Sequence, residues 1–174
     1  MKTILTLTCI MSFLGLCSRN KYGVIAEGEN EKPKGNLIEY QYSYHVCMAY
    51  PQRYFNIKAN EDGVMTLSFS EQSNDEIRVM RIPDDALKAI QDTAQKYELY
   101  KIKQSFRPKA EVLDGDGWGL QLTYEDGYIF SGGSNASAFG PGSEGHYAIL
   151  KYVEELLQKT TPADSIGTAS HSNR

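Results

Sequence analysis

The stretch over residues 118–130 constrains the fold most, because large apolar side chains alternate with small or polar ones on both sides of a turn. Its first half places a large side chain at every second position: Trp118, Leu120, Leu122 and Tyr124. A period of two indicates a strand with one buried face. Residues 125–127 read Glu-Asp-Gly and match a three-residue hairpin loop with a left-handed glycine. That loop would pair Leu122 with Phe130 and bring Tyr128 to the same face.

The same turn sequence, at residues 61–63, separates a second pair of alternating segments. Phe55 and Ile57 precede the turn, and Leu67 and Phe69 follow it. A three-residue loop pairs Phe55 with Phe69 and Ile57 with Leu67. The sequence therefore predicts two β-hairpins of the same type.

Further strands and two helices are expected around these hairpins. Alternation over 38–46 and an apolar segment over 77–82 predict two more strands. Pro83, followed by two aspartates, suits the first turn of a helix. Ser143 is an expected N-cap for a second helix over 144–158. We therefore expect an α+β fold, in which an antiparallel β-sheet is built from two hairpins plus flanking strands and two helices pack on one face.

The first 17 residues have the pattern of a signal peptide. Lys2 precedes an apolar run over 4–16, which is shorter than the ~20 residues of a membrane-spanning helix. The run ends in Leu-Gly-Leu-Cys-Ser, which resembles a bacterial lipobox with Cys17 as the lipidated residue. Leu16 departs from the small residue usual at that position. Cleavage without lipidation and an uncleaved anchor therefore remain the alternatives.

The chain is expected to contain one folded domain, with polar segments at both ends. Residues 18–35 are polar and rich in Gly, Glu, Asn and Lys, as in a tether. Residues 36–159 are enough for a single α+β domain with its own core. Residues 160–174 are rich in Ser, Thr and Ala and are expected to be a disordered tail.

Composition excludes some classes of function. The net charge is −4, and no cluster of Lys and Arg is present, which argues against nucleic-acid binding. Two of the three cysteines lie within the signal peptide, so no disulfide framework is expected around Cys47. His45 and Cys47 lie two apart, and packing or surface roles are favoured over a Cys–His nucleophile pair. No motif implies a cofactor.

Two loops contain candidate ligand groups. The small-residue loop over 132–143 could hold an anion on its backbone N–H groups, although it lacks the ending of a nucleotide-binding P-loop. Asp114, Asp116 and Glu125 match acidic positions of an EF-hand calcium loop. Trp118 stands where that loop needs an oxygen ligand, and the second half of the match is a strand. A turn leading into the strand is therefore favoured, with metal binding as the weaker alternative.

The strand and turn over 118–127, the segment Gly133-Ser-Asn-Ala and the closing helix together resemble a group of small, uncharacterised bacterial exported proteins that includes lipoproteins. That group often has a proline soon after the Asn-Ala pair, whereas Ser137-Ala-Phe-Gly follows here. The resemblance implies an extracytoplasmic location, with a membrane-anchored lipoprotein first and a secreted or periplasmic protein second. It implies no activity.

The sequence favours a non-catalytic binding or interaction module, tethered to the cell envelope or secreted, over an enzyme. Its expected partners are an envelope protein or a glycan, and a lipid anchor would place it at the membrane. The candidate binding residues are Trp118, Tyr128 and Asn135, although alternation also allows aromatic residues to be core. One alternative is an extracytoplasmic hydrolase or metal-dependent enzyme that uses Asp114, Asp116, His45 or His146. Another is an inhibitor or immunity-type protein. No pattern specifies an oligomeric state.

Overall fold

The computed structural model describes residues 23–46, 53–70, 76–110 and 115–170. The predicted signal peptide, which includes Cys17, lies outside these ranges, as do Cys47 and Asp114. Lipidation of Cys17 and the role of Asp114 as a metal ligand therefore stay predictions.

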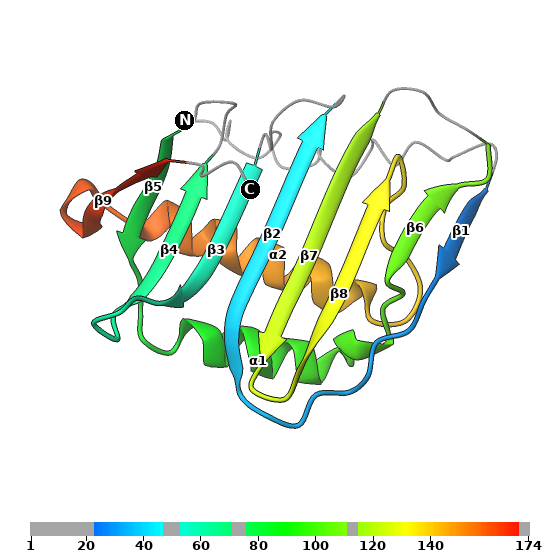
Figure 1. Ribbon diagram of the computed structural model, residues 1–174, viewed down its shortest axis with the longest axis horizontal. Helices are drawn as coiled ribbons and strands as arrows, with labels where there is room; N and C mark the ends of the chain where they lie inside the picture. Colours follow the sequence, from blue (N-terminus) through cyan, green and yellow to red (C-terminus); the bar gives the residue numbers. More distant parts are fainter. Residues whose placement is uncertain (1–22, 47–52, 71–75, 111–114, 171–174) are drawn as a thin grey trace, which may run out of the picture.

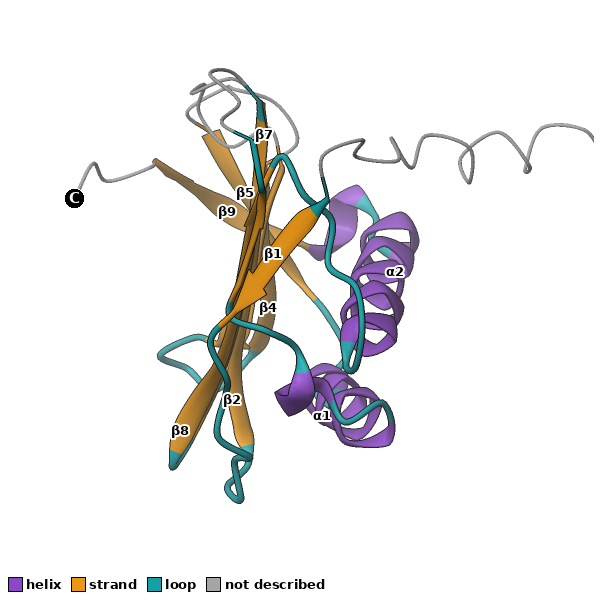
Figure 2. Cartoon of the chain, turned by 90° about the vertical axis from the view of Figure 1, so that its right-hand side faces the viewer, coloured by secondary structure: helices purple, strands orange, loops and turns teal. Residues whose placement is uncertain are grey.

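Within these described ranges, nine strands form one sheet and two α-helices form a second layer (Figures 1 and 2). The strands are β1 (Val24–Glu27), β2 (Leu37–Val46), β3 (Arg53–Ala59), β4 (Met65–Ser70), β5 (Glu76–Arg81), β6 (Ser105–Pro108), β7 (Asp116–Tyr124), β8 (Gly127–Ser134) and β9 (Ser165–Ser170). Their order across the sheet is β1-β6-β8-β7-β2-β3-β4-β5-β9. Neighbours are antiparallel except β6 and β8, which are parallel. The helices α1 (Ala86–Lys96) and α2 (Ser143–Lys159) cover the same face of the sheet. The expected α+β fold is confirmed.

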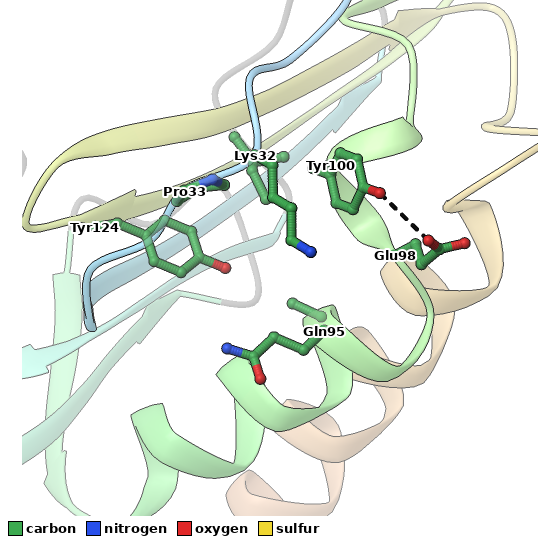
Figure 3. Close-up of a pocket in the computed structure, with 8 residues that line it drawn as sticks. Lys32, Pro33, Gln95, Glu98, Tyr100 and Tyr124 are labelled. Atoms are coloured by element: carbon green, nitrogen blue, oxygen red, sulfur yellow. Dashed lines mark hydrogen bonds between the residues drawn. The ribbon is translucent and has the colours of Figure 1, made fainter.

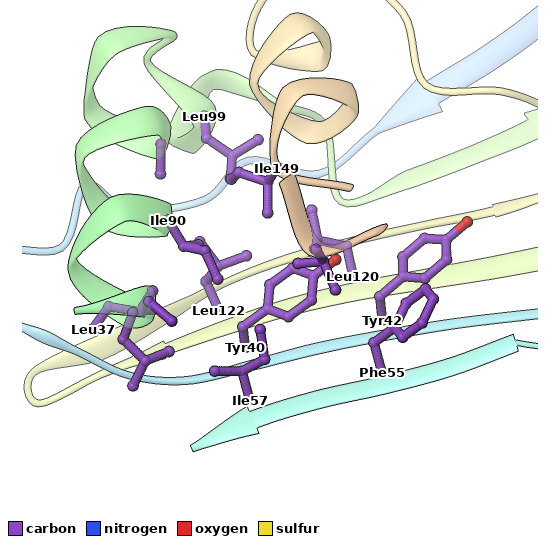
Figure 4. Packing of buried hydrophobic residues seen from close by; sticks show 14 of the residues in the cluster. Leu37, Tyr40, Tyr42, Phe55, Ile57, Ile90, Leu99, Leu120, Leu122 and Ile149 are labelled. Atoms are coloured by element: carbon purple, nitrogen blue, oxygen red, sulfur yellow. The ribbon is translucent and has the colours of Figure 1, made fainter. Parts of the chain in front are cut away.

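The core lies between the sheet and the helices (Figure 4). Tyr40 of β2, Ile57 of β3 and Leu122 of β7 point from adjacent strands toward the helical layer and are fully buried. Ile90 of α1 and Ile149 of α2 meet them from the other side and are also fully buried. The period of two in the strands and the helical spacing in α1 and α2 thus converge on one apolar layer.

The hairpin formed by β3 and β4 has the predicted register. Phe55 pairs with Phe69 and Ile57 pairs with Leu67. Gly63 adopts a left-handed φ of 78° in the loop, as the three-residue turn requires. The side-chain oxygen of Asn60 accepts hydrogen bonds from the backbone N–H groups of two loop residues, at 3.0 and 2.9 Å.

The register predicted for the hairpin of β7 and β8 is wrong by one residue. Tyr124 pairs with Gly127 and Leu122 pairs with Ile129, so only two residues form the loop. Gly127 does not adopt the left-handed conformation that a three-residue loop would need. Because successive side chains of a strand point to opposite faces, Tyr128 and Phe130 lie on the face away from the helices.

The acidic side chains of this loop bind a segment that is distant in sequence. The carboxylate of Asp126 accepts hydrogen bonds from the backbone N–H groups of Lys34 (2.8 Å) and Gly35 (2.9 Å). The carboxylate of Glu125 accepts one from the backbone N–H of Asn36 (3.0 Å). The bonds from the N–H groups of Gly35 and Lys34 hold the pKa of Asp126 below its usual range. They stabilise the shorter loop, which the local sequence does not reveal.

The predicted limits of the domain are too narrow. β1 lies in the expected tether and pairs with β6, with Ala26 opposite Phe106. β9 lies in the expected disordered tail and pairs with β5, with Gly167 opposite Val79. Backbone hydrogen bonds join both strands to the sheet, so their polar composition does not prevent pairing. The two edges of the sheet are thus made from the two ends of the described chain.

Candidate functional site

The face of the sheet opposite the helices is not covered by any described helix or strand (Figure 2). Four uncharged polar residues lie opposite one another across its centre: Gln121 of β7, Gln41 of β2, Asn56 of β3 and Ser68 of β4. We call these residues the amide row. Phe130 of β8 lies opposite Gln121 and closes the row at one end. Neighbouring strands are ~4.8 Å apart, so the row places a polar side chain at each such step. Asn56 is only 3% exposed, whereas Gln121, Gln41 and Ser68 are half-buried and reach the surface.

Two aromatic side chains stand beside the amide row on β8. Tyr128 is 60% exposed and Phe130 is 41% exposed. They are two residues apart on one strand, so they share a face at a spacing of roughly 7 Å. The ring of Phe130 lies beside Gly132, with its Cζ 3.6 Å from the position that a Cβ at Gly132 would take. The absence of a side chain at Gly132 leaves room for this ring.

The charge at the centre of the face is locally compensated. One carboxylate oxygen of Glu39 accepts hydrogen bonds from the amides of Gln41 (3.1 Å) and Asn56 (2.7 Å). The same oxygen lies 3.6 Å from the ammonium of Lys58. These contacts orient the two amides and leave the carbonyl oxygen of the half-buried Gln41 as an acceptor, whereas Asn56 is buried beneath them. The amide of Gln121 donates to the hydroxyl of Thr123 at 3.2 Å.

Trp118 lies on the opposite face, beneath α2. Its ring stacks on His146 with centroids 4.8 Å apart and lies 6.0 Å from the ring of Phe106. Its indole N–H donates to the backbone oxygen of Ala136 at 2.7 Å. The polar atom of this half-buried side chain is therefore engaged within the protein. Trp118 packs the helical layer and is separated by the sheet from Tyr128.

Asn135 has a structural position at the end of the β7–β8 hairpin. It adopts a left-handed φ of 50°. Its backbone N–H donates to the backbone oxygen of Asp116 at 2.7 Å, and its side-chain oxygen accepts the N–H of Asp116 at 3.0 Å. The three candidate binding residues are therefore not brought together. The residues that sequence reasoning missed, Phe130 and Gln121, depend on the register of the hairpin.

The acidic residues of the EF-hand match are far apart where they are described. Asp116 begins β7 and Glu125 follows its end, a separation of roughly 30 Å at the rise of an extended strand. The hydroxyl of Tyr44 donates to the Asp116 carboxylate at 2.7 Å. One ion therefore cannot bind both Asp116 and Glu125. Within the described residues, no group of three or more His, Cys, Asp or Glu side chains is placed to hold a metal ion.

The two described histidines proposed for an enzyme lie on opposite faces of the sheet. The ring of His45 occupies the space above Gly117 on the uncovered face. His146 is buried in the first turn of α2, against Trp118 and Tyr42. A shared catalytic site that uses both histidines is therefore not formed by this fold.

No protein-family model matches the chain, and comparisons with curated proteins and with solved structures found no significant match. In the part of the chain that the structure describes, no helix is long and apolar enough to cross a membrane. The function of the chain therefore has to be inferred from its geometry.

Proposed function

We propose that the protein is a non-catalytic binding module of the bacterial cell envelope, and that it binds a glycan chain on the uncovered face of the sheet. The observation behind this proposal is the amide row, which ends beside two exposed aromatic rings. Amide groups donate and accept hydrogen bonds, as sugar hydroxyls do. The faces of aromatic rings provide apolar area for the C–H faces of sugar rings. The compensated charge of Glu39 suits a neutral partner.

The glycan proposal is tested by titrating the purified protein with neutral oligosaccharides, cellohexaose and chitohexaose, in a calorimeter. Phe130→Ala and Tyr128→Ala are each expected to weaken binding about tenfold. The reason is that an aromatic contact at the centre of an interface commonly contributes 1 kcal/mol or more, and about 1.4 kcal/mol is tenfold in affinity.

Ile166→Ala is the matched control, because this side chain is 50% exposed on β9, at the far edge of the sheet. It should bind like the unmodified protein. The proposal is wrong if neither oligosaccharide binds, or if binding is unaffected by both aromatic substitutions. Shortened oligosaccharides after incubation would contradict the non-catalytic role. Retention of an envelope protein through Tyr128 and Phe130, with no binding of sugars, would favour the protein partner instead.

The location proposed for the module is extracytoplasmic, with Cys17 as the lipid attachment site. The signal-peptide pattern and the lipobox-like residues before Cys17 support this location.

In a bacterial host, Cys17→Ser is expected to abolish incorporation of radiolabelled palmitate and to move the protein from the membrane fraction to the soluble fraction. Cys9→Ser lies within the apolar run and serves as the control that keeps the label. Equal labelling of both variants would contradict lipidation at Cys17, and retention of the unmodified protein inside the cytoplasm would contradict export.

A further inference from the structure

A cavity of about 360 Å³ lies on the helical side of the β7–β8 hairpin, beside the C-terminal end of α1 (Figure 3). Three of its lining residues contribute apolar surface: Pro33, Ala94 and Ile129. Three others contribute polar groups: Lys32, Gln95 and Tyr124. Its volume is at the lower end of the range for ligand sites in proteins, ~300–1,000 Å³, and suits a small molecule.

The polar groups of the cavity converge. The ammonium of Lys32 and the hydroxyl of Tyr124 point toward the same space, and the amide of Gln95 lies along α1 at its edge (Figure 3). None of these three groups has a hydrogen bond or ion pair to another described residue. The ammonium of Lys32 lies 5.3 Å from the ring centre of Tyr100, which keeps it beside the cavity.

The negative charge at the rim of the cavity is already paired. The carboxylate of Glu98 accepts hydrogen bonds from the ammonium of Lys101 at 2.6 Å and from the hydroxyl of Tyr100 at 3.2 Å. The bond from Lys101 holds the pKa of Glu98 below its usual range. Glu98 therefore stays ionised and engaged by Lys101 and Tyr100. The charge of Lys32 also lowers the pKa of Glu98, but the Lys32 ammonium forms no direct ion pair or hydrogen bond with a carboxylate among the described residues.

Tyr124 acts as a hydrogen-bond donor in this setting. Burial raises the pKa of Tyr124 to about 12, so the phenol keeps its proton at neutral pH. A protonated phenol and an ammonium that face one space favour an anion that accepts hydrogen bonds. The apolar lining favours a ligand with a hydrocarbon body.

We propose that this cavity binds a small organic carboxylate, whose carboxyl group lies between Lys32 and Tyr124. Its apolar part packs against Ala94 and Ile129. This site is distinct from the glycan surface, because Tyr124 and Ile129 face the helices whereas Tyr128 and Phe130 face away from them. The two sites share a hairpin and are separated by its backbone.

The proposal is tested by calorimetric titration of the protein with benzoate and hexanoate, and with the neutral amides benzamide and hexanamide. At least one carboxylate is expected to bind saturably, and its amide at least tenfold more weakly. Lys32→Gln should weaken carboxylate binding about tenfold or more, because it removes the positive charge beside the cavity. Tyr124→Phe should weaken it by a similar factor, because it removes only the donor and keeps the buried ring.

Lys88→Gln is the matched control, since Lys88 is an exposed lysine of α1 that pairs with Asp92 at 2.8 Å and does not line the cavity. This variant should bind the carboxylate with the affinity of the unmodified protein. Phe130→Ala should do so as well, whether or not it weakens glycan binding. Absence of saturable binding by both acids overturns the proposal. Equal affinity for acid and amide, or binding unaffected by Lys32→Gln, also overturns it. Lys32 is exposed, so its substitution tests the site without disturbing the core.

Discussion

Replacing Gly133 by alanine is expected to destabilise the protein by about 3 kcal/mol, the upper part of the usual cost of overpacking. A Cβ at Gly133 would overlap the indole nitrogen of Trp118 and the backbone oxygen of Ala136. These two atoms form a hydrogen bond with each other, so the new methyl group would disturb both the packing and the bond. Urea unfolding followed by the fluorescence of Trp118, the single tryptophan of the chain, measures the effect.

Gly127→Ala is the matched control for this substitution. Gly127 belongs to the same strand, yet a Cβ there would meet nothing within 4 Å. The free energy of unfolding of the Gly127→Ala protein should differ from that of the unmodified protein by less than about 0.5 kcal/mol, as is usual for surface positions. Similar losses at both positions would contradict the packing explanation and would point to the backbone conformation of β8.

The stability of the protein is expected to fall between pH 6.5 and pH 4 because of His146. Burial lowers the pKa of His146 from 6.5 to about 4. Its Nδ1 atom has no hydrogen-bond partner among the residues that the structure describes, and its position in the first turn of α2 further disfavours a positive charge. Over this range the unfolded chain binds a proton that the folded protein does not bind. The contribution of neutral His146 to the free energy of unfolding is fully present above pH 6.5. It falls by about 3 kcal/mol as the pH approaches 4.

His146→Leu supplies the comparison for this pH dependence. Leucine has a similar volume and does not titrate, so the variant should lack the part of the slope between pH 6.5 and 4. The free energy of unfolding in urea, measured at intervals from pH 4 to 7.5 for both proteins, gives the difference. If the two curves run parallel over that range, His146 does not bear the pH dependence.

The elements that follow from local pattern were predicted correctly. The β3–β4 hairpin has the expected register, because Gly63 takes the left-handed position that the turn sequence provides. The first helix follows the N-terminal signal of Pro83 and its two aspartates, and Leu87, Ile90 and Ala94 at helical spacing form its buried face. In these segments the nearest neighbours in sequence determine the structure.

The candidate site could not be predicted, because distant segments determine it. Both hairpins, β3–β4 and β7–β8, have the turn sequence Glu-Asp-Gly. In the β7–β8 hairpin, however, the backbone N–H groups of Lys34 and Gly35 bind Asp126 and stabilise a shorter loop. Because the register differs by one residue from the predicted one, Phe130 lies on the uncovered face and not in the expected core. Pairing of β1 with β6 was missed for the same reason, since its partner strand is distant in sequence.

The central strand β2 also affects how the protein folds. On one side it pairs with β3, which follows it directly, and on the other side with β7, whose Asp116 is 72 residues from Tyr44. Before β7 pairs with it during folding, one edge of β2 has no partner strand, and the apolar faces of its tyrosines remain exposed. Sheets with such distant pairings fold slowly, commonly in milliseconds to seconds. Slow pairing would leave time for the proposed export to precede folding, whereas the same open edge makes a stalled chain prone to pair with another copy.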